Sequence, residues 1–152
     1  MAFEIMLFSI PEAVVITRLV KELSGAKITL DKLLWVGILT GICTGLLRLV
    51  INSLILSMIS YAAVVVLLFW LFKATEIWKV AVSVGISLPL YLLVEVISVV
   101  VIQEIFSPDL EENLTNKFLV FLPQLVIMAV IVTLFTKANV RLFVGDSMDE
   151  GD

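Results

Sequence analysis

Residues 48–73 read RLVINSLILSMISYAAVVVLLFWLFK. Every residue between the two terminal bases is uncharged, and the run is longer than the roughly 20 apolar residues that a helix needs to cross a bilayer. Asn52 and the serine after it are typical of a tight turn, and Arg48 marks the end of the preceding helix. We therefore expect one membrane helix to end at this turn and a second to cover residues 54–72.

Apolar stretches of similar length lie on both sides of this run. Length and hydropathy predict five membrane-spanning helices, over residues 3–20, 33–51, 54–72, 78–103 and 118–136. The first is the weakest because it carries Glu4, Glu12 and Arg18, so its polar face is expected inside the bundle or at the interface. The predicted fold is all-α, a polytopic membrane helical bundle that forms one domain over residues 1–144. A short acidic tail, 145–152, is expected to be disordered.

The composition also indicates a membrane protein. Hydrophobic residues make up 61% of the chain and the mean hydropathy is +1.17, whereas soluble domains are about 45–50% apolar. A lipid bilayer is the partner that covers so much apolar surface, and we expect a multi-pass protein of the cell membrane. The net charge is −4, and nucleic-acid binding, which needs a basic patch, is not expected.

The basic residues predict the orientation of the chain in the membrane. Of ten Lys and Arg residues, only Arg48 and Lys117 fall on one side of the predicted bundle. The other side carries Arg18, Lys21, Lys27, Lys32, Lys73, Lys79, Lys137 and Arg141. Cytoplasmic segments carry the excess of bases, so the N-terminus is predicted outside and the C-terminus inside.

A stripe of glycines runs along the second predicted helix. Gly37, Gly41 and Gly45 recur every four residues, which places them on one helix face. Small residues let two helix backbones approach closely in a membrane. The partner of this stripe is either another span of the same chain or a second copy in a homodimer.

Four polar residues stand out inside the predicted spans, namely Glu12, Arg48, Glu95 and Gln124. At about 1.5 Å per residue, Arg48 and Glu95 come to similar depths in the outer part of the membrane, with Gln124 nearby. We predict that Arg48 and Glu95 pair with each other or face water, because an isolated charge in hydrocarbon is costly. The cluster is either a structural ion pair or a ligand-binding pocket open to the outside, and Glu12 fits either arrangement.

Two prolines fall inside predicted spans. Pro89 and Pro123 each lack a backbone donor and are expected to kink their helices. Such kinks act either as hinges or as fixed features of the shape.

The sequence does not predict catalysis. It contains no histidine, so a Ser/His or Cys/His dyad is impossible. No cluster has the spacing of metal ligands, and no glycine-rich phosphate loop occurs, so we expect neither a metal nor a cofactor.

Several short segments follow one another in a fixed order between residues 3 and 136. They are SIPEA at 9–13, GAKI at 25–28, Lys32-Leu33, GLLRL at 45–49, Phe72-Lys73 with Lys79, Glu95, LEE at 110–112 and LPQ at 122–124. In this order they resemble the membrane sensor region of Gram-positive sensor histidine kinases with a GHKL-type ATPase domain, a group that includes peptide-sensing and sporulation-type kinases. Those kinases continue into a helix with a phospho-accepting histidine and an ATP-binding domain. This chain ends soon after its last span, so we expect a truncated sensor, a free-standing relative or a subunit that acts through partners.

The resemblance implies detection of an extracellular ligand and dimerisation. The expected function is that of a non-catalytic integral membrane sensor that signals to a cytoplasmic partner. Two alternatives remain open from the sequence: a substrate-binding membrane subunit of a transporter, and a scaffold subunit of an envelope complex.

Overall fold

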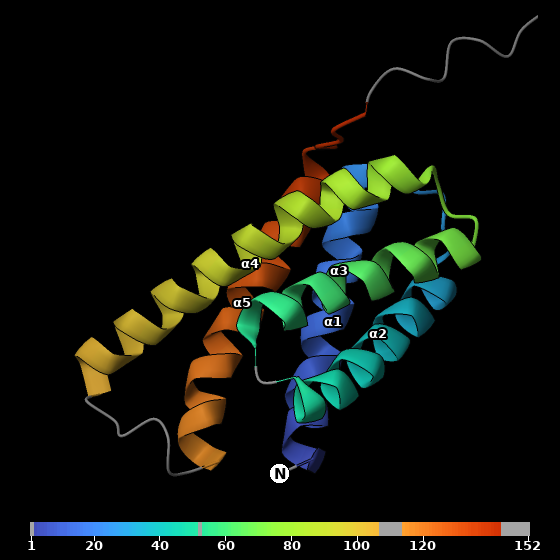
Figure 1. The fold of residues 1–152 in the computed structure, drawn as a ribbon. Coiled ribbons are helices and arrows are strands. Elements are labelled where there is room, and N and C mark those ends of the chain that lie inside the picture. Colours follow the sequence, from blue (N-terminus) through green and yellow to red (C-terminus); the bar gives the residue numbers. More distant parts are fainter. Residues whose placement is uncertain (1, 52, 107–113, 144–152) are drawn as a thin grey trace, which may run out of the picture.

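The computed structural model describes residues 2–51, 53–106 and 114–143, and this part of the chain forms five α-helices and no strand (Figure 1). The helices are α1 (Ala2–Ser24), α2 (Leu30–Val50), α3 (Leu54–Leu71), α4 (Ile77–Phe106) and α5 (Leu114–Lys137). The all-α prediction is confirmed. Most of the helices extend past the predicted spans because polar residues at their ends continue the helical turns. The predicted turn residue Asn52, most of the acidic outer loop (107–113) and the tail at 145–152 lie outside the described residues.

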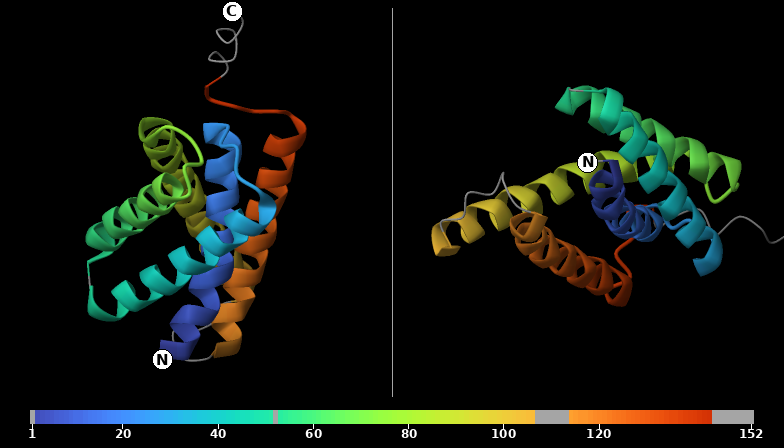
Figure 2. Two further views of the ribbon diagram at one scale, coloured as in Figure 1. Left: turned by 90° about the vertical axis from the view of Figure 1, so that its right-hand side faces the viewer. Right: turned by 90° about the horizontal axis from the view of Figure 1, so that it is seen from below.

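Successive helices run in opposite directions, and α1 lies in the middle of the bundle (Figures 1 and 2). It packs against α2, α4 and α5, whereas α3 packs against α2 and α4. The core follows α1, where Ala13, Ile16, Leu19 and Val20 are fully buried. The central position explains why the first predicted span is the least apolar, since its neighbours shield it from lipid.

Within the described residues, three helical segments are long and apolar enough to cross a membrane, namely Leu30–Val50, Ile77–Ile105 and Phe118–Lys137. Ile55–Leu71 is apolar but shorter, and α1 does not combine the length and the apolar composition that a membrane-spanning helix needs. Large apolar side chains such as Ile55 and Val96 are exposed on the outer faces, where lipid would cover them. The helices are therefore those of a membrane protein, and five crossings remain a prediction.

The loops and helix ends that carry most of the bases meet at one end of the bundle. The amide of Lys27 donates to the carbonyl of Ala74 over 3.1 Å, and the amide of Leu142 donates to the carbonyl of Leu23 over 3.0 Å. These bonds join the α1–α2 loop to the α3–α4 loop, and the segment after α5 to the end of α1. The base-rich segments thus share one end, as the alternation of helices requires, and the side of the membrane that this end faces remains a prediction.

The glycine stripe packs against α1 of the same chain. A Cβ atom added to Gly41 would lie 2.6 Å from the Cα of Ile10, and one added to Gly37 would lie 2.8 Å from the Cα of Val14. Gly45 is buried on the same helix. These glycines let the two backbones nearly touch, so the geometry corresponds to packing within the chain rather than between copies.

Both prolines lie within continuous helices. Pro89 is inside α4 and Pro123 is inside α5, and both are exposed on the outer surface. A third proline, Pro11, lies inside α1, where the sequence prediction had placed no kink. A role for these residues as hinges remains a prediction.

The close contact of α1 and α2 leads to a test with a matched control. Gly41→Ala places a methyl group against the α1 backbone, which cannot move away without separating the helices, so we expect a loss of about 1–3 kcal/mol in the free energy of unfolding. Gly85→Ala is the control, because a Cβ there meets no atom within 4 Å, and the change gains up to about 1 kcal/mol from helix propensity. Reversible unfolding in mixed micelles measures both. Equal stability of the two variants would contradict the close contact.

Candidate functional site

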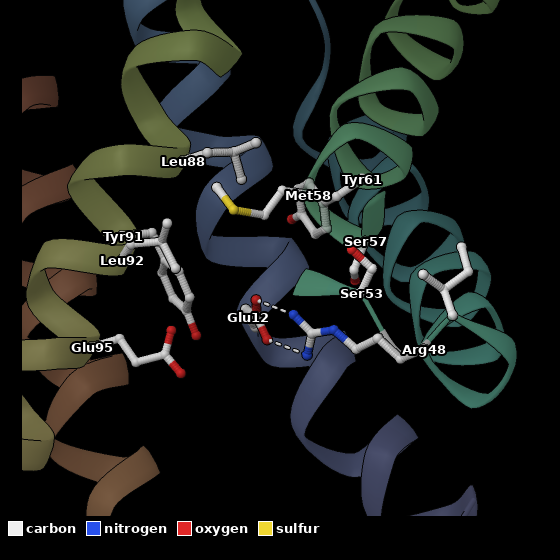
Figure 3. A pocket seen from close by; sticks show the side chains of 11 residues that line it. Glu12, Arg48, Ser53, Ser57, Met58, Tyr61, Leu88, Tyr91, Leu92 and Glu95 are labelled. Atoms are coloured by element: carbon white, nitrogen blue, oxygen red, sulfur yellow. Dashed lines mark hydrogen bonds and ion pairs between the residues drawn. The ribbon is translucent and has the colours of Figure 1, made fainter. Parts of the chain in front are cut away.

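A cavity of about 350 Å³ opens between α1, α2, α3 and α4 (Figure 3). Its lining contains both polar and apolar side chains. The lining residues are Glu12, Arg48, Ile51, Ser53, Ser57, Met58, Tyr61, Leu88, Tyr91, Leu92 and Glu95. A polar cavity among apolar helices is the most distinctive feature of this bundle.

Glu12 and Arg48 form a two-pronged ion pair at the centre of this cavity. The Nη2 atom of Arg48 lies 3.1 Å from Oε1 of Glu12, and its Nη1 atom donates to Oε2 over 3.3 Å. The Glu12 side chain is only 8% exposed, whereas that of Arg48 is 40% exposed. A buried carboxylate without a partner would be costly, so the guanidinium compensates a charge that α1 brings into the core.

The local sequence of α2 explains how Arg48 reaches Glu12. The glycine stripe holds α2 against α1, and Arg48 occupies the last turn of α2, where the helix dipole favours a cation. Side chains on a helix tilt toward its N-terminus, which turns Arg48 back toward the middle of the bundle. Beyond it the chain leaves the helix at Ile51, and the Ser53 hydroxyl accepts a hydrogen bond from the amide of Leu56 at the start of α3.

Glu95 faces the same cavity from α4 but is not the ion-pair partner of Arg48. No ion pair joins Glu95 to any residue that the structure describes. The prediction that Arg48 pairs with Glu95 is therefore wrong, and Glu12 takes that place. Arg48 and Glu95 do line the same cavity, but Glu12 comes from the helix that packs on α2, whereas Glu95 stands across the cavity (Figure 3).

The two tyrosines of the chain both line the cavity, and sequence reasoning missed them. The hydroxyl of Tyr91 lies between the carboxylates of Glu12 and Glu95 in Figure 3, and it interacts with Glu12. Tyr61 is 4% exposed, and its hydroxyl has no hydrogen-bond partner among the described residues. The spacing of Tyr91 four residues before Glu95 was a usable signal, because such residues share a helix face.

Gln124 does not belong to this cavity. It is 3% exposed on α5, a helix that contributes no lining residue, and its Nε2 atom lacks a partner among the described residues. The helix α5 packs on α1 and α4, whereas Arg48 belongs to α2, which packs on α1 and α3. The predicted cluster of four residues is thus a cluster of three, Glu12, Arg48 and Glu95, with Gln124 apart.

Comparisons with models of protein families, with curated proteins and with solved structures find no match. The cavity is therefore the feature of this chain that points to a function. Three of the motif segments named above, SIPEA, GLLRL and Glu95, supply its charged residues.

The ion pair can be tested by double-mutant cycles with Glu12→Gln, Arg48→Gln and Glu95→Gln, each alone and in pairs. Residues in direct contact couple by about 0.5–3 kcal/mol, so we expect coupling of that size between Glu12 and Arg48 in the free energy of unfolding. Coupling between Glu95 and Arg48 is expected to be smaller, since the guanidinium is paired with Glu12 and no ion pair joins it to Glu95. A larger value for the Glu95 pair would contradict the geometry.

Proposed function

We propose that this chain is a non-catalytic membrane receptor. It binds a small polar ligand in the cavity between α1, α2, α3 and α4 and transmits the change to a cytoplasmic partner. The observation that supports the proposal best is the cavity itself, with two carboxylates, a guanidinium and two phenols inside an apolar bundle. Such groups are costly in a membrane and are typically retained for a function. A volume of about 350 Å³ lies within the range of small-molecule sites.

The ligand is proposed to enter from outside the cell. Arg48 lies at the end of the bundle opposite the base-rich loops, and the excess of bases marks the cytoplasmic side. Its side chain is 40% exposed, so it is the member of the ion pair that an incoming ligand can reach. The ion pair would then be the element that an incoming polar ligand rearranges.

The helices that carry the two carboxylates also reach the opposite end of the bundle. There the amide of Leu142 bonds to Leu23 of α1, and the ring of Phe143 packs edge-on against Trp78 of α4, with 4.7 Å between centroids. The segment after α5 therefore touches both α1 and α4. A shift of α1 relative to α4 at the cavity would displace this segment. Its base Arg141, together with Lys137 at the end of α5, suits an acidic partner surface.

The proposal predicts both access to the cavity and coupling to the far end. In a Cys43→Ser, Trp35→Phe, Trp70→Phe background, Trp78 is the only tryptophan and reports on its contact with Phe143. We expect Ser57→Cys, in the cavity, to react with an impermeant methanethiosulfonate added outside intact cells. In purified protein the same modification should shift the emission of Trp78.

Ser60→Cys is the control on the same helix, because Ser60 does not line the cavity. Its modification should leave the Trp78 emission unchanged. Failure of position 57 to react from outside would overturn the entry route, and reaction without any change at Trp78 would overturn the transmission.

A further inference from the structure

The cavity carries one carboxylate more than its guanidinium neutralises. Glu12 and Arg48 face each other at 3.1 Å and balance one another. Glu95 is half-buried in the same cavity and has no ion pair with a described residue. A ligand that brings a positive charge would complete this balance, whereas an anion would add a second uncompensated negative charge.

The remaining lining supplies hydrogen-bonding oxygens and aromatic rings. The Tyr61 hydroxyl is buried, lacks a partner among the described residues and turns toward the cavity (Figure 3). The hydroxyl of Tyr91 lies beside Glu95, and those of Ser53 and Ser57 add further acceptors. An N–H group finds acceptors here, and the tyrosine rings attract cations through their π faces.

The size and the donor set favour an organic cation over a bare metal ion. A volume of about 350 Å³ far exceeds a single ion. Among the described residues, no group of three or more Cys, Asp or Glu side chains comes together as metal ligands. The apolar side chains of Leu88 and Leu92 line the same cavity and suit a short carbon skeleton.

We infer that the cavity selects a small organic cation, with its ammonium group on Glu95 and its carbon skeleton against Tyr61, Tyr91 and Leu88. The inference rests on the proposed receptor function and names the class of its ligand. A soluble amine and the ethanolamine headgroup of a lipid share this chemistry.

The test uses three probes of the same length and different charge, namely butylammonium, 1-butanol and butyrate. Each is titrated against the full chain in lipid-free detergent, with the thermal unfolding midpoint and calorimetric binding as readouts. We expect butylammonium alone to raise the midpoint. Glu95→Gln should weaken its binding by about ten- to a hundredfold, since the lost bond involves a charged group. Glu104→Gln is the control, because Glu104 is an exposed residue of α4 outside the cavity.

Repeating the titration in bilayers separates the two sources of the amine. Binding that persists in both phosphatidylglycerol and phosphatidylethanolamine supports a soluble amine. If butylammonium binding is lost only in phosphatidylethanolamine, the lipid headgroup occupies the site and is its natural ligand. Either result supports the cation site.

The opposite results are also distinguishable. Binding of butanol or butyrate that Tyr61→Phe weakens would overturn the cation preference and leave a receptor cavity. Binding of no probe, or equal binding to the Glu95→Gln and Glu104→Gln variants, would also overturn the inference, while the Ser57→Cys experiment decides the receptor function separately.

Discussion

The near-contact of the α1 and α2 backbones is the constraint on which the rest of the bundle depends. Without side chains at Gly37 and Gly41, α2 can lie directly on Val14 and Ile10. Lipid supplies no hydrophobic drive for helix association, so close packing of this kind has to supply the attraction. The contact fixes the position of α2, and with it the reach of Arg48, which is the side chain that neutralises Glu12.

The central position of α1 in the bundle allows it to carry a polar face. A helix surrounded by others need not be apolar on every side, and α1 uses this freedom to bring Glu12 into the core. A buried ion pair usually adds little to the free energy of unfolding, because apolar residues of the same size often stabilise a fold at least as well. Its placement in a cavity, with Glu95 and two tyrosines, is the observation that supports the proposed ligand site.

Much of the fold was predictable because its signals are local. The length and hydropathy of the apolar runs predicted the helices, and the spacing of the glycines predicted a close contact. The site was only partly predictable, since depth along a helix gives one coordinate and not the direction that a side chain faces. Arg48 and Glu95 matched in predicted depth but stand on opposite walls, and Gln124 matched nearly as well from a helix that does not line the cavity. The tyrosines were missed because an aromatic residue in an apolar run looks like ordinary packing.

The decisive measurement is whether the guanidinium of Arg48 contacts the carboxylate of Glu12 in a lipid bilayer. Rotational-echo solid-state NMR on protein with ¹⁵N-labelled arginine and ¹³C-labelled glutamate detects a guanidinium nitrogen close to a carboxylate carbon. We expect a strong dephasing signal that disappears in Glu12→Gln and persists in Glu95→Gln. A signal that persists in Glu12→Gln and disappears in Glu95→Gln would contradict the position of α1 and the cavity built around it.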